Sequence, residues 1–236
     1  MVTAGRLFLI PCTLGDTEPD QVIPGQTIAR LLKLNEFIVE EIPTARRYLR
    51  KAGYAGDLGK IEFYVFNEHS QPDDIVPAIN SLLSGHDIGL LSEAGSPCVA
   101  DPGNIMVRMA HQHGIQVIPL TGPSSILLAL MASGFNGQNF TFRGYLPIRT
   151  HERIRQIRLL EKTIYQLDQT QIFIEAPYRN LALFKDIIRT CSDDTYLCLA
   201  CDLTLGTEWI RTQRIVNWKQ GTPDIHKRPT VFLLYK

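Results

Sequence analysis

Short apolar runs alternate with amphipathic stretches along the first half of the chain. The runs are short enough for buried strands of a parallel sheet, and they lie at 6–10, 37–39, 63–66, 88–91 and 115–118. The stretch 73–83 and the stretch that begins at Pro102 carry apolar residues at helical spacing. Strands that alternate with helices predict an α/β domain with a largely parallel sheet.

The second half repeats this alternation with different lengths. Strands are expected at 140–142, 171–174, 196–201, 214–216 and 230–235. Helices are expected at 126–131 and 181–188, and a basic stretch follows residue 149. We therefore expect two α/β domains, an N-terminal one over residues 1–120 and a C-terminal one over 121–236.

Two loops rich in glycine and proline follow neighbouring strands of the first half. Ser92–Gly103 follows the run at 88–91, and Thr121–Ser125 follows the run at 115–118. Both are placed at the carboxyl ends of strands, where open α/β sheets bind ligands. One such loop could be an ordinary tight turn, but two in succession, with Glu93 and Asp101 in the first, favour a ligand site.

Composition narrows the classes of partner. The 236 residues carry 24 basic and 24 acidic side chains, so the protein has no net charge to attract nucleic acid globally. No apolar run approaches the roughly 20 residues of a membrane span. The N-terminus leads directly into a strand without the form of a signal peptide. We therefore expect a cytoplasmic protein without a membrane partner.

The five cysteines do not indicate a metal site. Cys198 and Cys201 have the CxxC spacing, but on a strand their side chains point to opposite faces. No second Cys or His pair stands nearby to complete a zinc site. Reduced structural thiols and no bound metal are expected.

One basic run stands out in this neutral chain. It contains Arg149, His151, Arg153, Arg155, Arg158 and Lys162. Clustered arginines suit contacts with phosphates, and a solvated helix face explains the same pattern equally well.

Several motifs carry a resemblance to a known family. Ser92–Gly103 resembles the signature S-[DE]-A-G-[ST]-P-x-x-[AS]-D-P-G of the ribosomal RNA ribose 2′-O-methyltransferases with the tetrapyrrole methylase fold. The loop at 121–125 is similar to that family's G-P-S loop, and Glu175–Arg179 resembles its E-[SA]-P-[HY]-R motif. The chain departs from the pattern at 39–43, where the family shows A-E-D-T-R, and at 227–229.

The resemblance implies a fold, a cofactor and partners. The fold would consist of two α/β domains with a cleft between them for S-adenosyl-L-methionine. The substrate would be ribosomal RNA or the small ribosomal subunit, and the protein would form a homodimer. Longer members carry a further helical domain after the last strand, so the chain is identified as a short member.

The resemblance also implies site residues. Asp101, Glu93 and His69 are the catalytic candidates, and the sequence does not decide which is the general base. Glu93 and Asp101 could equally bind cofactor hydroxyls or hold the loop, and His69 could order its own loop. Cofactor contacts are expected from Pro11, Glu93, Ala94, Gly95, Pro97, Val99, Thr121, Gly122, Ser124, Ser125, Glu175, Ala176 and Pro177. RNA contacts are expected from Arg143, Arg149, Arg153, Arg155 and Arg158.

Two other functions fit the same sequence. One is a non-catalytic nucleic-acid or nucleotide-binding module, which the departures from the family pattern would suit. The other is a methyltransferase that acts on a small molecule such as a tetrapyrrole, against which the basic run counts.

Overall fold

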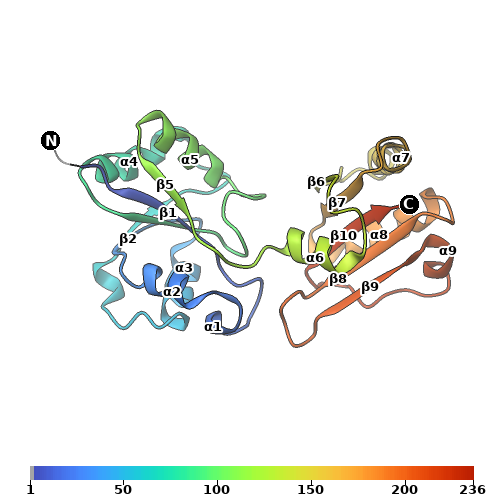
Figure 1. The fold of residues 1–236 in the computed structure, drawn as a ribbon, viewed down its shortest axis with the longest axis horizontal. Coiled ribbons are helices and arrows are strands. Elements are labelled where there is room, and N and C mark those ends of the chain that lie inside the picture. The colour runs from blue at the N-terminus through green and yellow to red at the C-terminus, as the bar shows by residue number, and fades with distance from the viewer. Residues whose placement is uncertain (1–2) are drawn as a thin grey trace. The chain divides into compact units, whose positions relative to one another are not determined.

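The chain divides after Ser124 into two compact units. The computed structural model describes residues 3–236 (Figure 1). The division lies a few residues beyond the boundary expected after residue 120. Each unit has its own sheet and its own hydrophobic core, so each is described by itself.

The first unit is built on a parallel sheet with the strand order β3-β2-β4-β1-β5. Its strands are β1 (Arg6–Ile10), β2 (Glu36–Val39), β3 (Glu62–Val65), β4 (Ile88–Leu91) and β5 (Gln116–Pro119). All four residues of β4 are buried, which explains its continuous apolar run. Its helices are α1 (Pro19–Val22), α2 (Gly25–Leu31), α3 (Ile42–Lys51), α4 (Val76–Leu83) and α5 (Gly103–Gln112).

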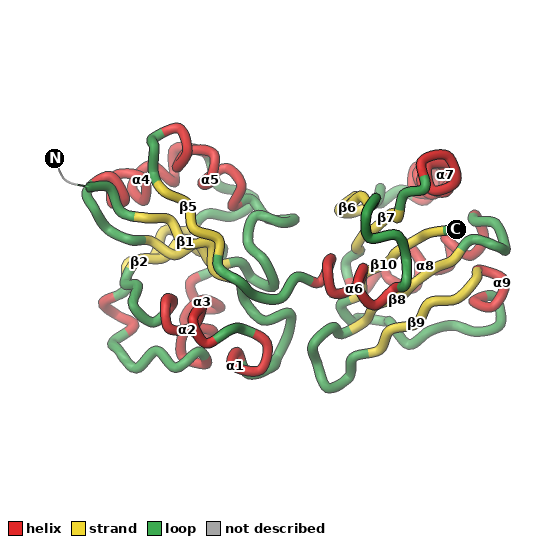
Figure 2. The backbone as a smooth tube through the Cα atoms, in the orientation of Figure 1, coloured by secondary structure: helices red, strands yellow, loops and turns green. Residues whose placement is uncertain are grey.

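Helices cover both faces of this sheet. Helices α1 to α3 pack on one face, and α4 and α5 pack on the other (Figures 1 and 2). The connection from β1 to β2 therefore leaves on one face, and the connection from β4 to β5 leaves on the opposite face. Because β1 and β4 are neighbours in the sheet, the strand order reverses between them. Open α/β sheets bind ligands outside such a reversal.

The second unit has a mixed sheet with the strand order β6-β7-β10-β8-β9. Its strands are β6 (Phe140–Tyr145), β7 (Thr170–Ile174), β8 (Tyr196–Cys201), β9 (Trp209–Arg214) and β10 (Thr230–Tyr235). Its helices are α6 (Ser125–Ser133), α7 (Thr150–Leu167), α8 (Asn180–Thr190) and α9 (Ile215–Trp218). Only β6 and β7 pair in parallel. The expectation of a largely parallel sheet is therefore wrong here, because β8 and β9 are joined by a short turn that permits only antiparallel pairing.

One expected strand is also wrong. The run 214–216 lies where β9 ends and α9 begins. Ile215 and Trp218 are both buried, three residues apart on one helical face. An apolar run this short does not distinguish a strand end from a helical turn. Among residues 3–236, no helix has the length and apolar character needed to cross a membrane.

Candidate active site

The loops that follow β1 and β4 are fastened to each other. The backbone N–H of Cys12 donates to the Gly95 carbonyl at 2.9 Å, and the N–H of Gly95 donates to the Cys12 carbonyl at 3.2 Å. The Ser92 hydroxyl also donates to the Gly95 carbonyl, at 2.7 Å. The two loops therefore form one rigid edge at the reversal point of the first sheet.

Two glycines permit close packing here, Gly95 in the loop after β4 and Gly122 in the loop after β5. Gly95 has φ +71°, and a Cβ there would lie 2.9 Å from Cδ2 of Leu14. A Cβ on Gly122 would lie 2.2 Å from Cγ of Pro11. Gly95, Gly122 and Pro11 thus shape the loops, while the backbone groups of Gly95 pair with Cys12 and the Pro11 carbonyl accepts from Tyr48.

Asp101 holds the signature loop together. Its carboxylate accepts hydrogen bonds from the backbone N–H of Cys98 at 2.8 and 2.9 Å and from that of Gly103 at 2.8 Å. The enclosed residues Cys98 and Ala100 have φ of +68° and +66°, a conformation that costs energy without glycine. Burial raises the pKa of Asp101, and the two N–H groups act against that rise.

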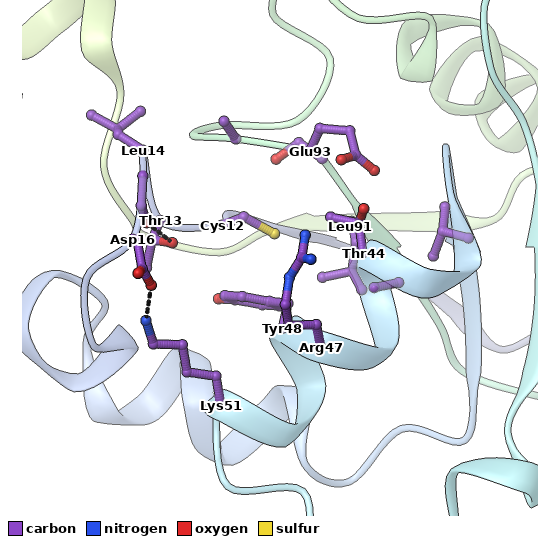
Figure 3. Close-up of a pocket in the computed structure, with 15 residues that line it drawn as sticks. Cys12, Thr13, Leu14, Asp16, Thr44, Arg47, Tyr48, Lys51, Leu91 and Glu93 are labelled. Atoms are coloured by element: carbon purple, nitrogen blue, oxygen red, sulfur yellow. Dashed lines mark hydrogen bonds and ion pairs between the residues drawn. The ribbon is translucent and has the colours of Figure 1, made fainter. Parts of the chain in front are cut away.

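A cavity of about 420 Å³ opens beside the two fastened loops (Figure 3). It is lined by the loop at 12–16, by the start of the signature loop at 91–94, and by α3. Tyr48 of α3 donates to the Pro11 carbonyl at 3.0 Å, and Lys51 bonds Oδ1 of Asp16 at 2.6 Å. The guanidinium of Arg47 points into the space below Glu93 (Figure 3).

A second cavity, of about 580 Å³, is strongly acidic. Its lining comprises Glu40, Glu41, Asn67, Glu68, His69, Glu93, Ala100, Asp101 and Pro102. The structure thus brings together all three catalytic candidates here, and Glu93 lines both cavities. His69 is exposed, with Nε2 3.6 Å from Oε1 of Glu68.

Two further carboxyl groups of this edge, Glu93 and Glu40, also have a raised pKa. Desolvation raises the pKa of Glu93, and the neighbouring Glu41 raises it further. The nearby Thr44 hydroxyl and the charge of Arg47 oppose that rise. The pKa of Glu40 is also raised, first by burial and then by Asp101 and Glu93. Perturbed carboxylates in a cleft are typical of functional sites.

Glu175 supplies a free acceptor in the second unit. Its Oε1 accepts from the N–H of Ala176 at 2.8 Å and from Nε of Arg179 at 2.9 Å. Its Oε2 is buried and has no hydrogen-bond partner among the described residues. A native structure rarely leaves a buried carboxylate oxygen without a hydrogen bond. This oxygen is therefore available to accept a hydrogen bond from a ligand. Pro177 begins a 3-10 turn at the end of β7.

The basic run forms α7, but its arginines differ in role. Arg149, Arg155 and Arg158 are exposed, whereas Arg153 is buried. Its Nε donates to Oδ2 of Asp186 at 2.8 Å, and its Nη1 donates to the Ile148 carbonyl at 2.8 Å.

The expected RNA contact of Arg153 is therefore wrong. Helical spacing places Arg153 on the face that carries Ile157, Leu160 and Ile164, and this face packs into the core. Arg143 is also engaged, with Nε donating to Oε1 of Gln171 at 2.8 Å.

Sequence reasoning missed the basic face of α3. Arg47 and Lys51 line the first cavity, and neither was among the residues expected at the site. Their spacing of four residues was the available signal, because it places both side chains on one face of a helix.

Comparison with known proteins places the chain in a family. No family model matches it. It is 30% identical over 233 residues to the ribosomal RNA small subunit methyltransferase I of Buchnera aphidicola. The aligned residues cover 98% of this chain and 78% of that protein. The chain belongs to the ribosomal RNA small subunit methyltransferase I family. The resemblance of the signature loops is thereby confirmed.

Other relatives of this family match over smaller shares of their length. The Vibrio cholerae protein of the same name is 31% identical over 175 residues, or 73% of this chain and 59% of that protein. The Escherichia coli O157:H7 protein is 27% identical over 206 residues, or 87% of this chain and 68% of that protein. The chain therefore spans less than two thirds of some curated relatives.

Solved structures confirm the tetrapyrrole methylase fold. The methyltransferase CobJ superposes with a TM-score of 0.66 at 15% identity, over 99% of this chain and 95% of that one. Uroporphyrin-III C-methyl transferase from Thermus thermophilus, in complex with S-adenyl homocysteine, gives a TM-score of 0.60 at 15% identity, over 98% of each chain. At this identity the likeness extends to the fold alone.

Proposed function

We propose that the protein transfers a methyl group from S-adenosyl-L-methionine to a ribose 2′-hydroxyl of small-subunit ribosomal RNA. Membership of the ribosomal RNA small subunit methyltransferase I family supports the reaction class and the substrate. The observation that carries the proposal is the position of Glu93, a carboxylate shared by two cavities at the reversal point of the first sheet.

The residues present fit this cofactor. Its ribose and amino-acid portion offer both donors and acceptors. In the first unit, Ala94, Pro97 and Val99 lie in the loop after β4, and Thr121 and Ser124 lie in the loop after β5. In the second unit, Glu175 presents the buried oxygen that has no partner, beside Ala176, and Ser125 begins α6. We propose these residues as the contacts in each unit.

Glu93 is the residue that we assign as the general base. When bound, the cofactor supplies a methyl group already activated by the sulfonium. The attacking ribose hydroxyl must lose its proton, and a carboxylate with a raised pKa accepts that proton more readily. Alignment of the hydroxyl supplies the remaining acceleration, up to roughly 7–11 kcal/mol in ideal cases.

The other candidates suit supporting roles. Both oxygens of Asp101 accept backbone N–H groups, so this carboxylate holds the loop. His69 lines only the acidic cavity and is exposed. The exposed Arg149, Arg155 and Arg158 of α7 are proposed to contact RNA phosphates, as clustered arginines do.

The assembly and location follow from the same proposal. A homodimer is implied by the family resemblance, and exposed apolar side chains of α6, Leu127 and Met131, would suit a covered surface. A ribosomal substrate would place the reaction in the cytoplasm.

Transfer of a labelled methyl group tests the reaction. The purified protein and labelled cofactor are incubated in three separate reactions. One contains small ribosomal subunits, one a tetrapyrrole extract and one total protein, all from cells that lack its gene. Label in the ribosomal RNA alone is expected. Label in the tetrapyrrole or protein fraction would overturn the acceptor assignment, and cofactor binding without any transfer would favour a binding module.

A further inference from the structure

Arg47 carries the cation that remains available in the first cavity. Lys51, one turn along α3, bonds Asp16 at 2.6 Å and lies 3.5 Å from Oε1 of Glu18. Within the described part of the chain, Arg47 has neither a hydrogen bond nor an ion pair, although its guanidinium reaches into the cavity (Figure 3). An arginine has five N–H donors in a planar fork that matches a phosphate or a carboxylate.

Most other polar groups around the cavity are already satisfied. Thr13 donates to the Gly15 carbonyl at 2.8 Å, and Tyr48 donates to the Pro11 carbonyl at 3.0 Å. Burial raises the pKa of the Cys12 thiol to about 12, so this group is neutral. Of the charged side chains that line the cavity, the guanidinium of Arg47 and the carboxylate of Glu93 have no hydrogen bond or ion pair within residues 3–236.

These two groups select a ligand that carries an anion and a hydroxyl donor together. An RNA nucleotide has this combination, because a backbone phosphate stands on the carbon next to the 2′-hydroxyl. A volume of about 420 Å³ lies within the range of small-ligand sites, roughly 300–1,000 Å³. A simple anion would use Arg47 and leave the carboxylate of Glu93 without a role.

We propose that this cavity holds the acceptor nucleotide, with a backbone phosphate bound by Arg47 and the ribose hydroxyl directed toward Glu93. The inference rests on the proposed function and assigns Arg47 as a positioning residue for the substrate. The family pattern A-E-D-T-R ends in an arginine, whereas this chain has Pro43 at that point. In this chain the guanidinium comes from Arg47, further along α3.

The test compares Arg47→Ala with Arg46→Ala. Arg46 is the neighbouring residue of α3, and its guanidinium lies over the Phe63 ring, 5.5 Å from the centroid, outside the cavity lining. The two variants lose the same charge from the same helix. Thermal unfolding confirms that both fold, and S-adenosylhomocysteine binding is measured by calorimetry.

Binding of small-subunit RNA is measured without turnover and at several salt concentrations. Arg47→Ala is expected to weaken RNA binding about tenfold or more, since it removes a charge-assisted contact. Its salt slope should fall by about 0.7–0.9, the contribution of one phosphate. The affinity for S-adenosylhomocysteine should stay unchanged, Arg46→Ala should resemble the wild type, and Arg47→Lys should recover part of the loss.

Three outcomes would overturn the inference. Equal RNA affinity and equal salt slope in Arg47→Ala and Arg46→Ala would show that Arg47 belongs to a solvated helix face and binds no phosphate. A loss confined to S-adenosylhomocysteine affinity would mean that the anion is the cofactor's carboxylate. Absence of RNA binding by the wild type would show that an RNA nucleotide is not the ligand of this cavity. Because binding is measured apart from turnover, failure of methyl transfer in the wild type remains a separate result that concerns the proposed function.

Discussion

Cys12 and Gly95 exchange both of their backbone hydrogen bonds, at 2.9 and 3.2 Å. Cys12 follows β1 and Gly95 follows β4, the two neighbouring strands whose connections leave on opposite faces of the sheet. This reciprocal pair fixes the loops that carry Thr13 and Glu93 against each other. The cavity at the reversal point is therefore preorganised, and its shape depends on Gly95 remaining a glycine.

Replacement of Gly95 by alanine should disrupt this edge. The added Cβ meets Leu14 Cδ2 at 2.9 Å, and a φ of +71° strains any other residue. We expect a loss of about 1–3 kcal/mol in the free energy of unfolding, measured by urea denaturation, together with weaker S-adenosylhomocysteine binding in calorimetry.

The matched control for this substitution is Gly53→Ala. Gly53 has φ +93° but nothing within 4 Å of an added Cβ. Its substitution carries the backbone strain alone and should leave cofactor affinity unchanged. If both variants lost cofactor affinity equally, the effect would come from stability and not from the loop.

Arg153→Ala should destabilise the second unit strongly. It leaves Asp186 buried without its partner, and breaking such a pair typically costs about 3–5 kcal/mol. Arg155→Ala, on the exposed face of α7, should change the free energy of unfolding by less than about 0.5 kcal/mol. Urea denaturation of both variants measures the difference. Equal stability of the two would contradict the buried ion pair.

The pH dependence of methyl transfer should report Glu93. A general base must be deprotonated, so the rate should rise as the pH increases through the raised pKa of Glu93. Glu41→Gln removes a neighbouring negative charge, so the pKa of Glu93 should fall and the acid limb should move to lower pH. Glu62→Gln, at the start of β3, should leave the limb in place. An unshifted limb in Glu41→Gln would remove Glu93 as the titrating group.

The raised pKa of Glu93 has the opposite effect on stability: the rate should rise with pH, whereas the free energy of unfolding should fall. A carboxyl whose pKa is higher in the folded state contributes stability that is complete below its unfolded pKa. That contribution is lost as the pH rises through the folded pKa. Glu40 and Asp101 act in the same direction as Glu93. Glu93→Gln should therefore reduce the loss of stability that occurs above the unfolded pKa, which urea denaturation at a series of pH values would measure.

Glu175→Gln should separate fold from ligand binding in the second unit. A glutamine keeps an oxygen acceptor for Ala176 N–H and Arg179, but it replaces the buried free oxygen by an NH2 donor and removes the negative charge. We expect about tenfold weaker S-adenosylhomocysteine binding, measured by calorimetry. Glu208→Gln is the control, because Glu208 accepts from the Thr204 N–H in the same unit and has no proposed role. Equal affinities would remove Glu175 from the cofactor contacts.

Much of the fold was predictable because burial leaves a direct signature. The fully buried β4 reads as a continuous apolar run, and β10 does the same. Strand direction leaves no such signature, so the antiparallel pairing of β8, β9 and β10 was missed. The first turn of α9 was also missed, because Ile215 and Val216 continue an apolar pattern that suits either structure.

The site was predictable where it depends on loops and not where it depends on side-chain partners. The signature loop placed Glu93 and Asp101 together, as the structure shows. The pairing of Arg153 with Asp186, 33 residues later, could not be read from a local charge pattern. The free guanidinium of Arg47 depends on Asp16 taking Lys51, which is a long-range contact of the same kind.

Mapping the methyl group on ribosomal RNA tests the central claim most directly. A 2′-O-methyl group blocks alkaline cleavage at its own nucleotide, because the neighbouring hydroxyl can no longer attack the phosphate. Small-subunit RNA from a deletion strain is treated with the purified protein and cofactor, and its alkaline ladder is compared with one made with Glu93→Gln. The account predicts a single new gap with the wild-type protein and none, or a much weaker one, with Glu93→Gln. A full gap with Glu93→Gln, or methylation without any gap, would contradict it.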